Sequence, residues 1–155
     1  MLFRSLGCSE LEANTFRNAY LGALPGVGEL QMATRNRFRR NDMIRTLGGR
    51  MYPCEPAKGG RSFEYKSLNL LIQGSAADQT KQAIINYCSR NSQTSYLLSQ
   101  VYDELNVSVP DELAHEQCYE LARSMKHAME LDVPVEVDVE AGPNWGDLSP
   151  VEMPR

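Results

Sequence analysis

The spacing of apolar residues predicts two helices near the start of the chain. The first spans residues 9–24, where Ser9 is a suitable N-cap and Glu12, three residues later, completes a capping box. Its apolar face consists of Leu11, Phe16, Ala19, Tyr20 and Ala23. Pro25 ends this helix, and a second helix is expected over residues 27–40.

A small hairpin and a long helix are expected next. Two short strands, residues 43–46 and 50–52, flank a glycine pair that suits a tight turn, and a loop containing Pro and Gly follows over residues 53–60. Apolar residues then recur at helical spacing over residues 62–89. The residues on that stripe are Leu68, Leu71, Ile72, Ala76, Ala83, Ile84 and Tyr87.

Two adjacent acids interrupt the most strand-like part of the sequence. Strand-like runs lie on both sides of Asp103 and Glu104, so we expect a hairpin with both acids at its turn. Carboxylates held on a rigid sheet edge suit Mg²⁺, because this ion takes oxygen ligands in near-octahedral geometry. For this segment alone, a solvated turn that binds nothing is the alternative interpretation.

A helix over residues 111–130, capped by Asp111, and a closing strand over residues 133–139 complete the pattern. Helices and antiparallel strands mix without a βαβ rhythm, which indicates the α+β class. The 155 residues are enough for one domain with a core of its own. The sequence has neither an apolar run long enough to span a bilayer nor a signal peptide, so we expect a cytoplasmic protein with no membrane partner.

Charge is distributed unevenly along the chain. Residues 1–100 carry 13 Lys and Arg against 7 Asp and Glu, whereas residues 101–155 carry 3 against 13. The basic excess is concentrated in Arg35, Arg37, Arg39, Arg40, Arg45 and Arg50, opposed locally by Asp42 alone. Such a cluster suits the backbone of a nucleic acid, although a solvated helix face is the commoner cause of a charge run. The four cysteines lack a Cys-x-x-Cys pair, so neither a zinc site nor a disulfide framework is expected.

Two amides of the long helix share one face. Asn69 and Gln73 are four residues apart, and Lys66 precedes Asn69 on the same stripe. Amides can both donate and accept hydrogen bonds, which suits the acceptors that every base pair presents in the minor groove. Ordinary exposed helix amides are the alternative interpretation.

Five segments, in order along the chain, match motifs of one family. They are Glu12-Ala13 with Phe16, Tyr20 and Pro25-Gly26-Val27, then Arg45-Thr46-Leu47-Gly48-Gly49-Arg50, Leu68-Asn69-Leu70-Leu71-Ile72-Gln73-Gly74-Ser75-Ala76-Ala77-Asp78, Gln100-Val101-Tyr102-Asp103-Glu104-Leu105, and Asp132-Val133-Pro134 with Gly142-Pro143-Asn144-Trp145. Over residues 2–148 the sequence resembles the C-terminal part of the family A DNA polymerases, the DNA polymerase I group of bacteria and phages.

The resemblance implies an α+β fold with a polymerase palm-like antiparallel sheet. The sheet would carry the motif C hairpin, residues 100–105, and would pack against long helices. Residues 1–42 would be the C-terminal part of a fingers-like helical region, and residues 43–155 a palm-like subdomain. The activity implied is DNA-directed DNA synthesis in replication, with primer-template DNA and a deoxynucleoside triphosphate as partners.

The resemblance also implies a role for each matching residue. Asp103 would hold catalytic Mg²⁺ in a two-metal phosphoryl transfer, and Glu104 would support the metal site and the primer end. Asn69 and Gln73 would contact the minor-groove edge of the primer-template. The other positions implied to contact DNA are Arg45, Arg50, Lys66, Gln100 and Tyr102.

The sequence departs from the family pattern in two places. Tyr102 stands where the family has His, which changes any contact with a primer phosphate. Tyr65 stands where bacterial members often have Arg, although Lys66 beside it supplies a positive charge.

Several family parts have no counterpart in the sequence, namely the motif A aspartate, the fingers helix that binds the triphosphate, the thumb and the exonuclease. We therefore expect the isolated chain to be inactive and to need an N-terminal polymerase fragment, with an unpaired sheet edge where the motif A strand belongs. A non-catalytic DNA-binding or accessory remnant is the alternative, which the joint presence of Asn69, Gln73, Asp103 and Glu104 disfavours.

Overall fold

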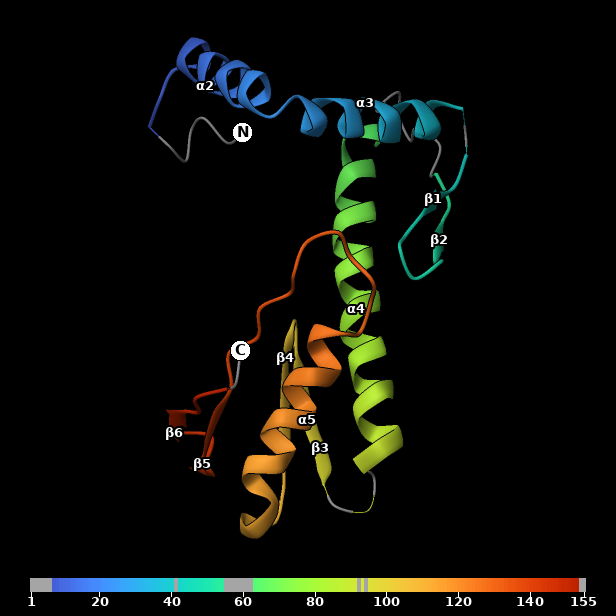
Figure 1. The fold of residues 1–155 in the computed structure, drawn as a ribbon. Coiled ribbons are helices and arrows are strands. Elements are labelled where there is room, and N and C mark those ends of the chain that lie inside the picture. Colours follow the sequence, from blue (N-terminus) through green and yellow to red (C-terminus); the bar gives the residue numbers. More distant parts are fainter. Residues whose placement is uncertain (1–6, 41, 55–62, 92, 94, 154–155) are drawn as a thin grey trace. The chain divides into compact units, whose positions relative to one another are not determined.

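The computed structural model of the chain divides into two compact units, residues 1–72 and residues 73–155 (Figure 1). It describes residues 7–40, 42–54, 63–91, 93 and 95–153. The sequence predicts a different boundary, between residues 42 and 43, because it marks the change from fingers to palm in the family. The two units are defined by compactness instead, so this boundary stays a prediction.

The first unit begins with the two expected helices. Helix α2, Glu10–Ala23, has Ser9 as its N-cap, and the capping box is confirmed: the backbone N–H of Ser9 donates to Glu12 Oε2 at 2.8 Å, and that of Glu12 donates to Ser9 Oγ at 3.3 Å. Helix α3, Pro25–Arg39, starts two residues earlier than predicted. Proline suits the first helical turn because its φ is already helical and no backbone N–H is needed there.

The small hairpin predicted after the helices is confirmed. Strands β1, Ile44–Arg45, and β2, Met51–Tyr52, pair antiparallel, with Ile44 opposite Tyr52. Most of the expected loop lies outside the described residues; only its first two residues, 53 and 54, are described, and they have no regular secondary structure.

The long helix is α4, Ser67–Asn91, which begins five residues later than the sequence indicates. A 3-10 helix, η1, occupies Glu64–Lys66, and the predicted first residue, 62, lies outside the described residues. Ser67 marks the junction: it is fully buried, and its hydroxyl donates to the carbonyl of Glu64 at 2.7 Å.

The acidic hairpin is confirmed, with one correction to its turn. Strands β3, Tyr96–Val101, and β4, Glu104–Ser108, pair antiparallel with Val101 opposite Glu104. The turn consists of Tyr102 and Asp103, so Glu104 is the first residue of β4 rather than a turn residue. Two central residues are enough to close this hairpin, and the next residue already pairs with the opposite strand.

The helix predicted over residues 111–130 is shorter and starts differently. A 3-10 helix, η2, covers Asp111–Leu113, and α5 covers Ala114–Lys126. Asp111 does not cap α5, because the 3-10 turn makes Leu113 the N-cap and Leu113 has no side-chain oxygen.

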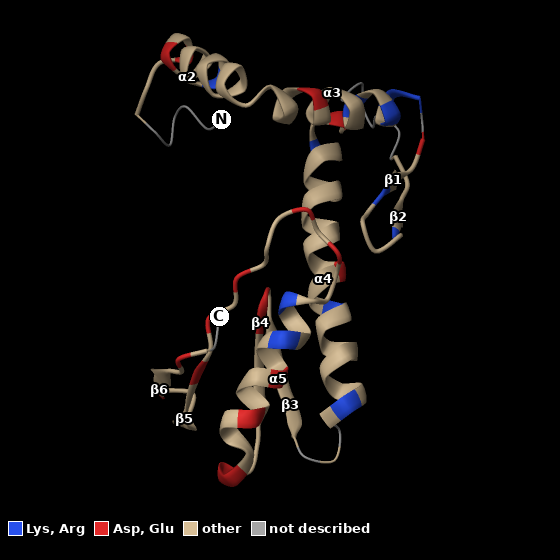
Figure 2. Cartoon of the chain, in the orientation of Figure 1, with Lys and Arg blue, Asp and Glu red and all other residues tan. Residues whose placement is uncertain are grey.

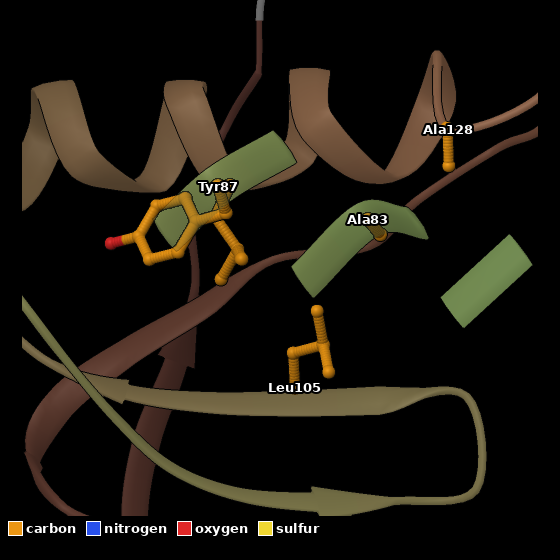
Figure 3. Close-up of a cluster of buried hydrophobic side chains, with 5 residues drawn as sticks. Ala83, Tyr87, Leu105 and Ala128 are labelled. Atoms are coloured by element: carbon orange, nitrogen blue, oxygen red, sulfur yellow. The ribbon is translucent and has the colours of Figure 1, made fainter. Parts of the chain in front are cut away.

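The core of the second unit joins both helices to the acidic hairpin. Ala83 and Tyr87 of α4, Leu105 of β4, Leu121 of α5 and Ala128 are all at most 8% exposed. In Figure 3 Leu105 points from its strand toward Ala83 on the helix. Burial of Leu105 therefore anchors β4 one residue after the paired acids.

The prediction of a closing strand at residues 133–139 is wrong. These residues are not in a strand, and the last two strands are β5, Glu140–Asn144, and β6, Asp147–Pro150, which pair with each other. The predicted alternation does exist, because Val135, Val137 and Val139 are half-buried between exposed neighbours. A strand also needs a ladder of backbone hydrogen bonds with a partner, and in the described part of the chain this segment belongs to no sheet; the carbonyl of Val139, at its end, accepts from the backbone N–H of Val151 at 2.8 Å.

The mixture of helices with two-stranded antiparallel sheets is the α+β class that the sequence indicates. Across the described ranges, the structure has no helix of the length and apolar character needed to cross a bilayer.

Candidate functional site

The acidic turn has an unusual backbone conformation. Tyr102 has a φ of 54°, in the left-handed region, and it is the only described residue other than glycine with a positive φ. Its side chain is 90% exposed, and Asp103 and Glu104 beside it are exposed as well. Both carboxylates are thus accessible at the end of a paired sheet.

Two amide side chains hold the acidic turn. Nε2 of Gln100 donates a 2.9 Å hydrogen bond to the carbonyl oxygen of Tyr102. On the other strand, Nδ2 of Asn106 donates a 3.0 Å hydrogen bond to Oε1 of Glu104. Our sequence analysis missed Asn106. The signal for it was its position two residues after Glu104, because residues at that spacing project from the same face of a strand.

A cavity of about 630 Å³ in the second unit includes the paired acids in its lining. Its lining comes from the start of β4, the middle of α4, the end of α5, residues 135–139, which lie outside any strand, and the last two strands. Carboxylates in the lining are Asp103, Glu104, Glu136, Asp138 and Glu140, and no Lys or Arg is among the lining residues. Acidic residues mark the tip of β4 and the segment after α5 in Figure 2. A hollow lined by one sign of charge favours a cation.

The donor set fits a hard divalent cation, but only in part. Asp103 and Glu104 offer carboxylate oxygens, which are the ligands that Mg²⁺ prefers. Nowhere in the described part of the chain do three or more acidic, histidine or cysteine side chains come close enough to hold a metal ion. The acidic hairpin can therefore supply one part of a coordination shell.

The two amides predicted to face the minor groove are both on α4. Asn69 and Gln73 are exposed and one helical turn apart, as expected. The next two residues, Gly74 and Ser75, are buried, which fits their small size. The amides are therefore available for an external partner.

The basic cluster of the first unit is partly neutralised. The Arg39 guanidinium donates from Nε to Glu64 Oε2 at 2.6 Å and from Nη2 to Glu64 Oε1 at 3.0 Å. These hydrogen bonds are the main reason that the pKa of Glu64 is lowered and that of Arg39 is raised. Arg40 pairs with Asp42 at 3.4 Å. Asp42 is thus not the only acid opposing the cluster, because folding brings Glu64 to it.

The other predicted DNA contacts of the first unit are held by local interactions. Nζ of Lys66 lies 4.6 Å from the ring centre of Phe63, which stabilises the cation against an aromatic face. The Thr46 hydroxyl accepts from the backbone N–H of Arg50 at 3.0 Å, and Gly49 between them has a φ of 88°. Arg45 packs beside Gly49, where an added Cβ would lie 3.6 Å from the guanidinium. The Thr-x-x-Gly-Arg element is therefore a tight turn that presents two arginines.

Of the predicted site residues, the structure gathers Gln100, Tyr102, Asp103 and Glu104 on one hairpin and adds Asn106 to them. Gln73 belongs to the same unit. Lys66 and Asn69, together with the two arginines of the Thr-x-x-Gly-Arg turn, belong to the first unit.

Comparison with known proteins shows that the chain matches one family over most of its length. The family model described as DNA polymerase family A matches residues 1–147. Among curated relatives, DNA polymerase I of Pseudomonas aeruginosa is 30% identical over 154 residues, and DNA polymerase I of Bacillus subtilis is 32% identical over 155 residues. Each match covers 94% of this chain, which corresponds to 17% and 18% of those relatives. A DNA-directed DNA polymerase of Pseudomonas phage M6 is 36% identical over 124 residues, covering 79% of this chain and 18% of the phage protein.

A solved structure is similar in fold as well as in sequence. The POL domain of Pol1 from M. smegmatis, in complex with DNA primer-template and dNTP, matches with a TM-score of 0.79 and 29% identity. The match covers 87% of this chain and 25% of that one, so this chain spans about a quarter of the solved domain and less than a fifth of the curated relatives. The chain belongs to DNA polymerase family A.

Proposed function

We propose that this chain acts as the C-terminal part of a DNA-directed DNA polymerase and contributes Asp103 to the metal site for nucleotidyl transfer. The observation that carries the proposal is the exposed carboxylate pair at the end of the β3–β4 hairpin, where the sequence resembles motif C of the family. A cytoplasmic location accords with this function.

In this proposal each acid of the hairpin has a separate task. Asp103 binds Mg²⁺ through its carboxylate, and Glu104 supports the site with the oxygen that Asn106 does not occupy. When bound, the two metal ions would lower the pKa of the primer 3′-hydroxyl and neutralise the charge of the leaving pyrophosphate. The chain's own residues hold the carboxylates at the end of a sheet anchored by Leu105.

Contacts with DNA would come from polar and basic residues on the surface. Asn69 and Gln73 contact the minor groove without reading its sequence, because every base pair presents acceptors there. Lys66, Arg45 and Arg50 contact phosphates and so position the duplex. The similarity to a polymerase domain solved with DNA primer-template and dNTP supports both partners.

Catalysis further requires a polymerase region that supplies the motif A aspartate. Two observations support this requirement. In the described part of the chain, β4 pairs with β3 alone, and residues 133–139 alternate like a strand but belong to no sheet, with a backbone hydrogen bond from Val151 to Val139 at the end of the segment. The cavity that includes the paired acids has both segments in its lining. A strand from the remaining polymerase region would satisfy both backbones and bring a second carboxylate to Asp103.

Primer extension by an assembled enzyme tests the proposal. The chain is co-expressed with the polymerase region that carries motif A, the fingers helix and the thumb, and extension of a radiolabelled primer is measured. Metal binding of this kind contributes several kcal/mol to transition-state stabilisation. Asp103→Asn should therefore reduce kcat on the order of a thousandfold. The matched control is Asp111→Asn, an exposed acid on η2, which should retain activity.

Two outcomes would contradict the proposal. Full activity of the Asp103→Asn assembly would remove the metal-binding role, and extension by the purified chain alone would remove the need for a second region. If no assembly extends a primer although the chain retains a primer-template duplex in a binding assay, the chain is a non-catalytic DNA-binding part instead.

A further inference from the structure

The backbone at the acidic turn is strained at a residue that gains little from burial. In hairpin turns with two central residues, a positive φ at only the first of them is the type II′ arrangement, in which glycine is favoured. Here that residue is Tyr102, with a φ of 54° and a side chain that is 90% exposed. A non-glycine residue in this region costs free energy and persists only where the surroundings impose it.

Gln100 is the side chain that restrains this turn. Its amide donates to the carbonyl of Tyr102 at 2.9 Å, and that carbonyl belongs to the same planar peptide group as the backbone N–H of Asp103. Fixing this peptide plane fixes the direction in which Asp103 leaves the backbone. The hydrogen bond links a residue of β3 to the turn two residues later, so it couples the side chain of Gln100 to the conformation of the turn.

Asn106 restrains the second acid in a parallel way. Its amide donates to one carboxylate oxygen of Glu104 at 3.0 Å, and Asn106 is half-buried whereas Glu104 is exposed. Ladder pairing places Asn106 opposite Ser99, beside a register shift between Leu97 and Ser99, and Glu104 opposite Val101, so both residues belong to the paired part of the hairpin. The bond limits the rotamers of an otherwise free carboxylate.

We propose that Gln100 and Asn106 are positioning residues that aim the carboxylates of Asp103 and Glu104, and that Gln100 acts through the strained turn rather than through contact with DNA. This inference rests on the function proposed above. It assigns a role to Asn106 and replaces the primer contact expected for Gln100. The two bonds together are called the amide clamp.

A mutant cycle on the turn separates positioning from DNA contact. Gln100→Met keeps the length of the side chain and removes its donor, and Tyr102→Gly removes the strain, because glycine adopts positive φ freely. In the assembled polymerase, Gln100→Met should lower kcat about tenfold or more, since small misplacements of catalytic groups carry large costs. The half-saturating Mg²⁺ concentration should rise severalfold, while the Kd for primer-template stays within about twofold. In the Tyr102→Gly background the further loss from Gln100→Met should shrink to about threefold or less.

Two other variants complete the design. Asn106→Leu should lower kcat and raise the Mg²⁺ requirement in the same direction. Gln82→Met is the matched control: the half-buried Gln82 of α4 donates a 2.9 Å bond to Asn86, away from the acidic turn in sequence, and its loss should leave kcat unchanged. The same four variants can be compared by urea unfolding of the chain alone, which needs no catalysis. The loss in free energy of unfolding caused by Gln100→Met should be smaller in the Tyr102→Gly background than in the native one.

The results that overturn the inference are distinct from those that overturn the proposed function. An equal loss from Gln100→Met in both backgrounds, or a weakened Kd for DNA with kcat unchanged, would show that Gln100 acts on DNA and not on the turn. If Asn106→Leu behaves like Gln82→Met, Asn106 has no positioning role. Only retention of activity by Asp103→Asn would remove the metal site itself, whatever the amide variants do.

Discussion

The hydroxyl of Tyr87 on α4 donates a 2.8 Å hydrogen bond to Oε1 of Gln117 on α5. Both residues are at most 3% exposed, and the amide of Gln117 continues the chain of bonds by donating to Oδ1 of Asn91 at 3.1 Å. Burial raises the pKa of the Tyr87 hydroxyl, so this group stays a neutral donor over the physiological range. The bond joins the two helices that support the acidic hairpin.

Removal of this hydroxyl should destabilise the second unit. Tyr87→Phe leaves the buried Oε1 of Gln117 without its donor, which costs about 1–3 kcal/mol. Tyr119→Phe on the same helix α5 removes the hydroxyl of a side chain that is 45% exposed, and it should change stability by about 0.5 kcal/mol or less. Urea denaturation followed by circular dichroism measures both. Identical midpoints for the two variants would mean that the bond contributes nothing.

Truncation of Leu105, which anchors the acidic hairpin, should lower stability more than loss of the Tyr87 hydroxyl. Leu105→Ala opens a cavity between β4 and α4 and should lower the free energy of unfolding by about 2–5 kcal/mol. Leu98→Ala makes the same change on β3, at a side chain that is 67% exposed, and should have little effect. Thermal denaturation of the two variants provides the comparison. A larger loss from Leu98→Ala would show that the packing face of the hairpin has been assigned wrongly.

The last hairpin depends on a glycine. A Cβ on Gly142 would lie 1.8 Å from the backbone oxygen of Asp147 on the opposite strand, and a backbone atom cannot move aside as a side chain can. Gly142→Ala should therefore separate β5 from β6, at a cost of about 1–3 kcal/mol or more. Gly146→Ala in the same hairpin places its Cβ 3.4 Å from a side-chain atom of Asn144 and should be tolerated. Amide hydrogen exchange of β5 and β6 should accelerate only in the first variant. Unchanged protection there would refute the clash.

The Arg39–Glu64 pair should make the stability of the first unit depend on pH. The hydrogen bonds from Arg39 hold the pKa of Glu64 below its usual value of 4.5, so the folded state binds this proton less readily than the unfolded state. The contribution is complete above the unfolded pKa and is lost as the pH falls through the folded pKa. Below about pH 4.5, stability should therefore fall more steeply for the native chain than for Glu64→Gln, and 1 M salt should reduce the difference because both groups are partly exposed.

Arg39→Met supplies the control for this pH dependence. Without the Arg39 guanidinium, a further Glu64→Gln change should alter the pH profile much less, because only the weaker attraction of Arg35 then lowers the pKa of Glu64. A change as large in the Arg39→Met background as in the native chain would assign the effect to another partner of Glu64.

Sequence alone determined the features that depend on neighbouring residues. The capping box of α2 involves two residues three positions apart, and the α4 stripe repeats every turn, so local spacing predicted both. The acidic hairpin followed from strand-like runs around a short polar turn, and the family followed from motifs in order along the chain. The prediction of a strand over residues 133–139 was wrong, although it rested on the same kind of local pattern. Alternation shows which residues are half-buried, but it does not show whether a partner strand is present.

Tertiary structure alone decided the features that join distant residues. Arg39 meets Glu64 across 25 positions, and Tyr87 meets Gln117 across 30, distances over which side-chain pairing leaves no periodic signal. The amide clamp on Asp103 and Glu104 shows most clearly what sequence spacing cannot predict. Its residues are close in sequence, but only the left-handed backbone of Tyr102 and the register of β3 against β4 decide which oxygen each amide reaches. Hydrogen bonding depends on direction as well as spacing, and direction is fixed only when the chain has folded.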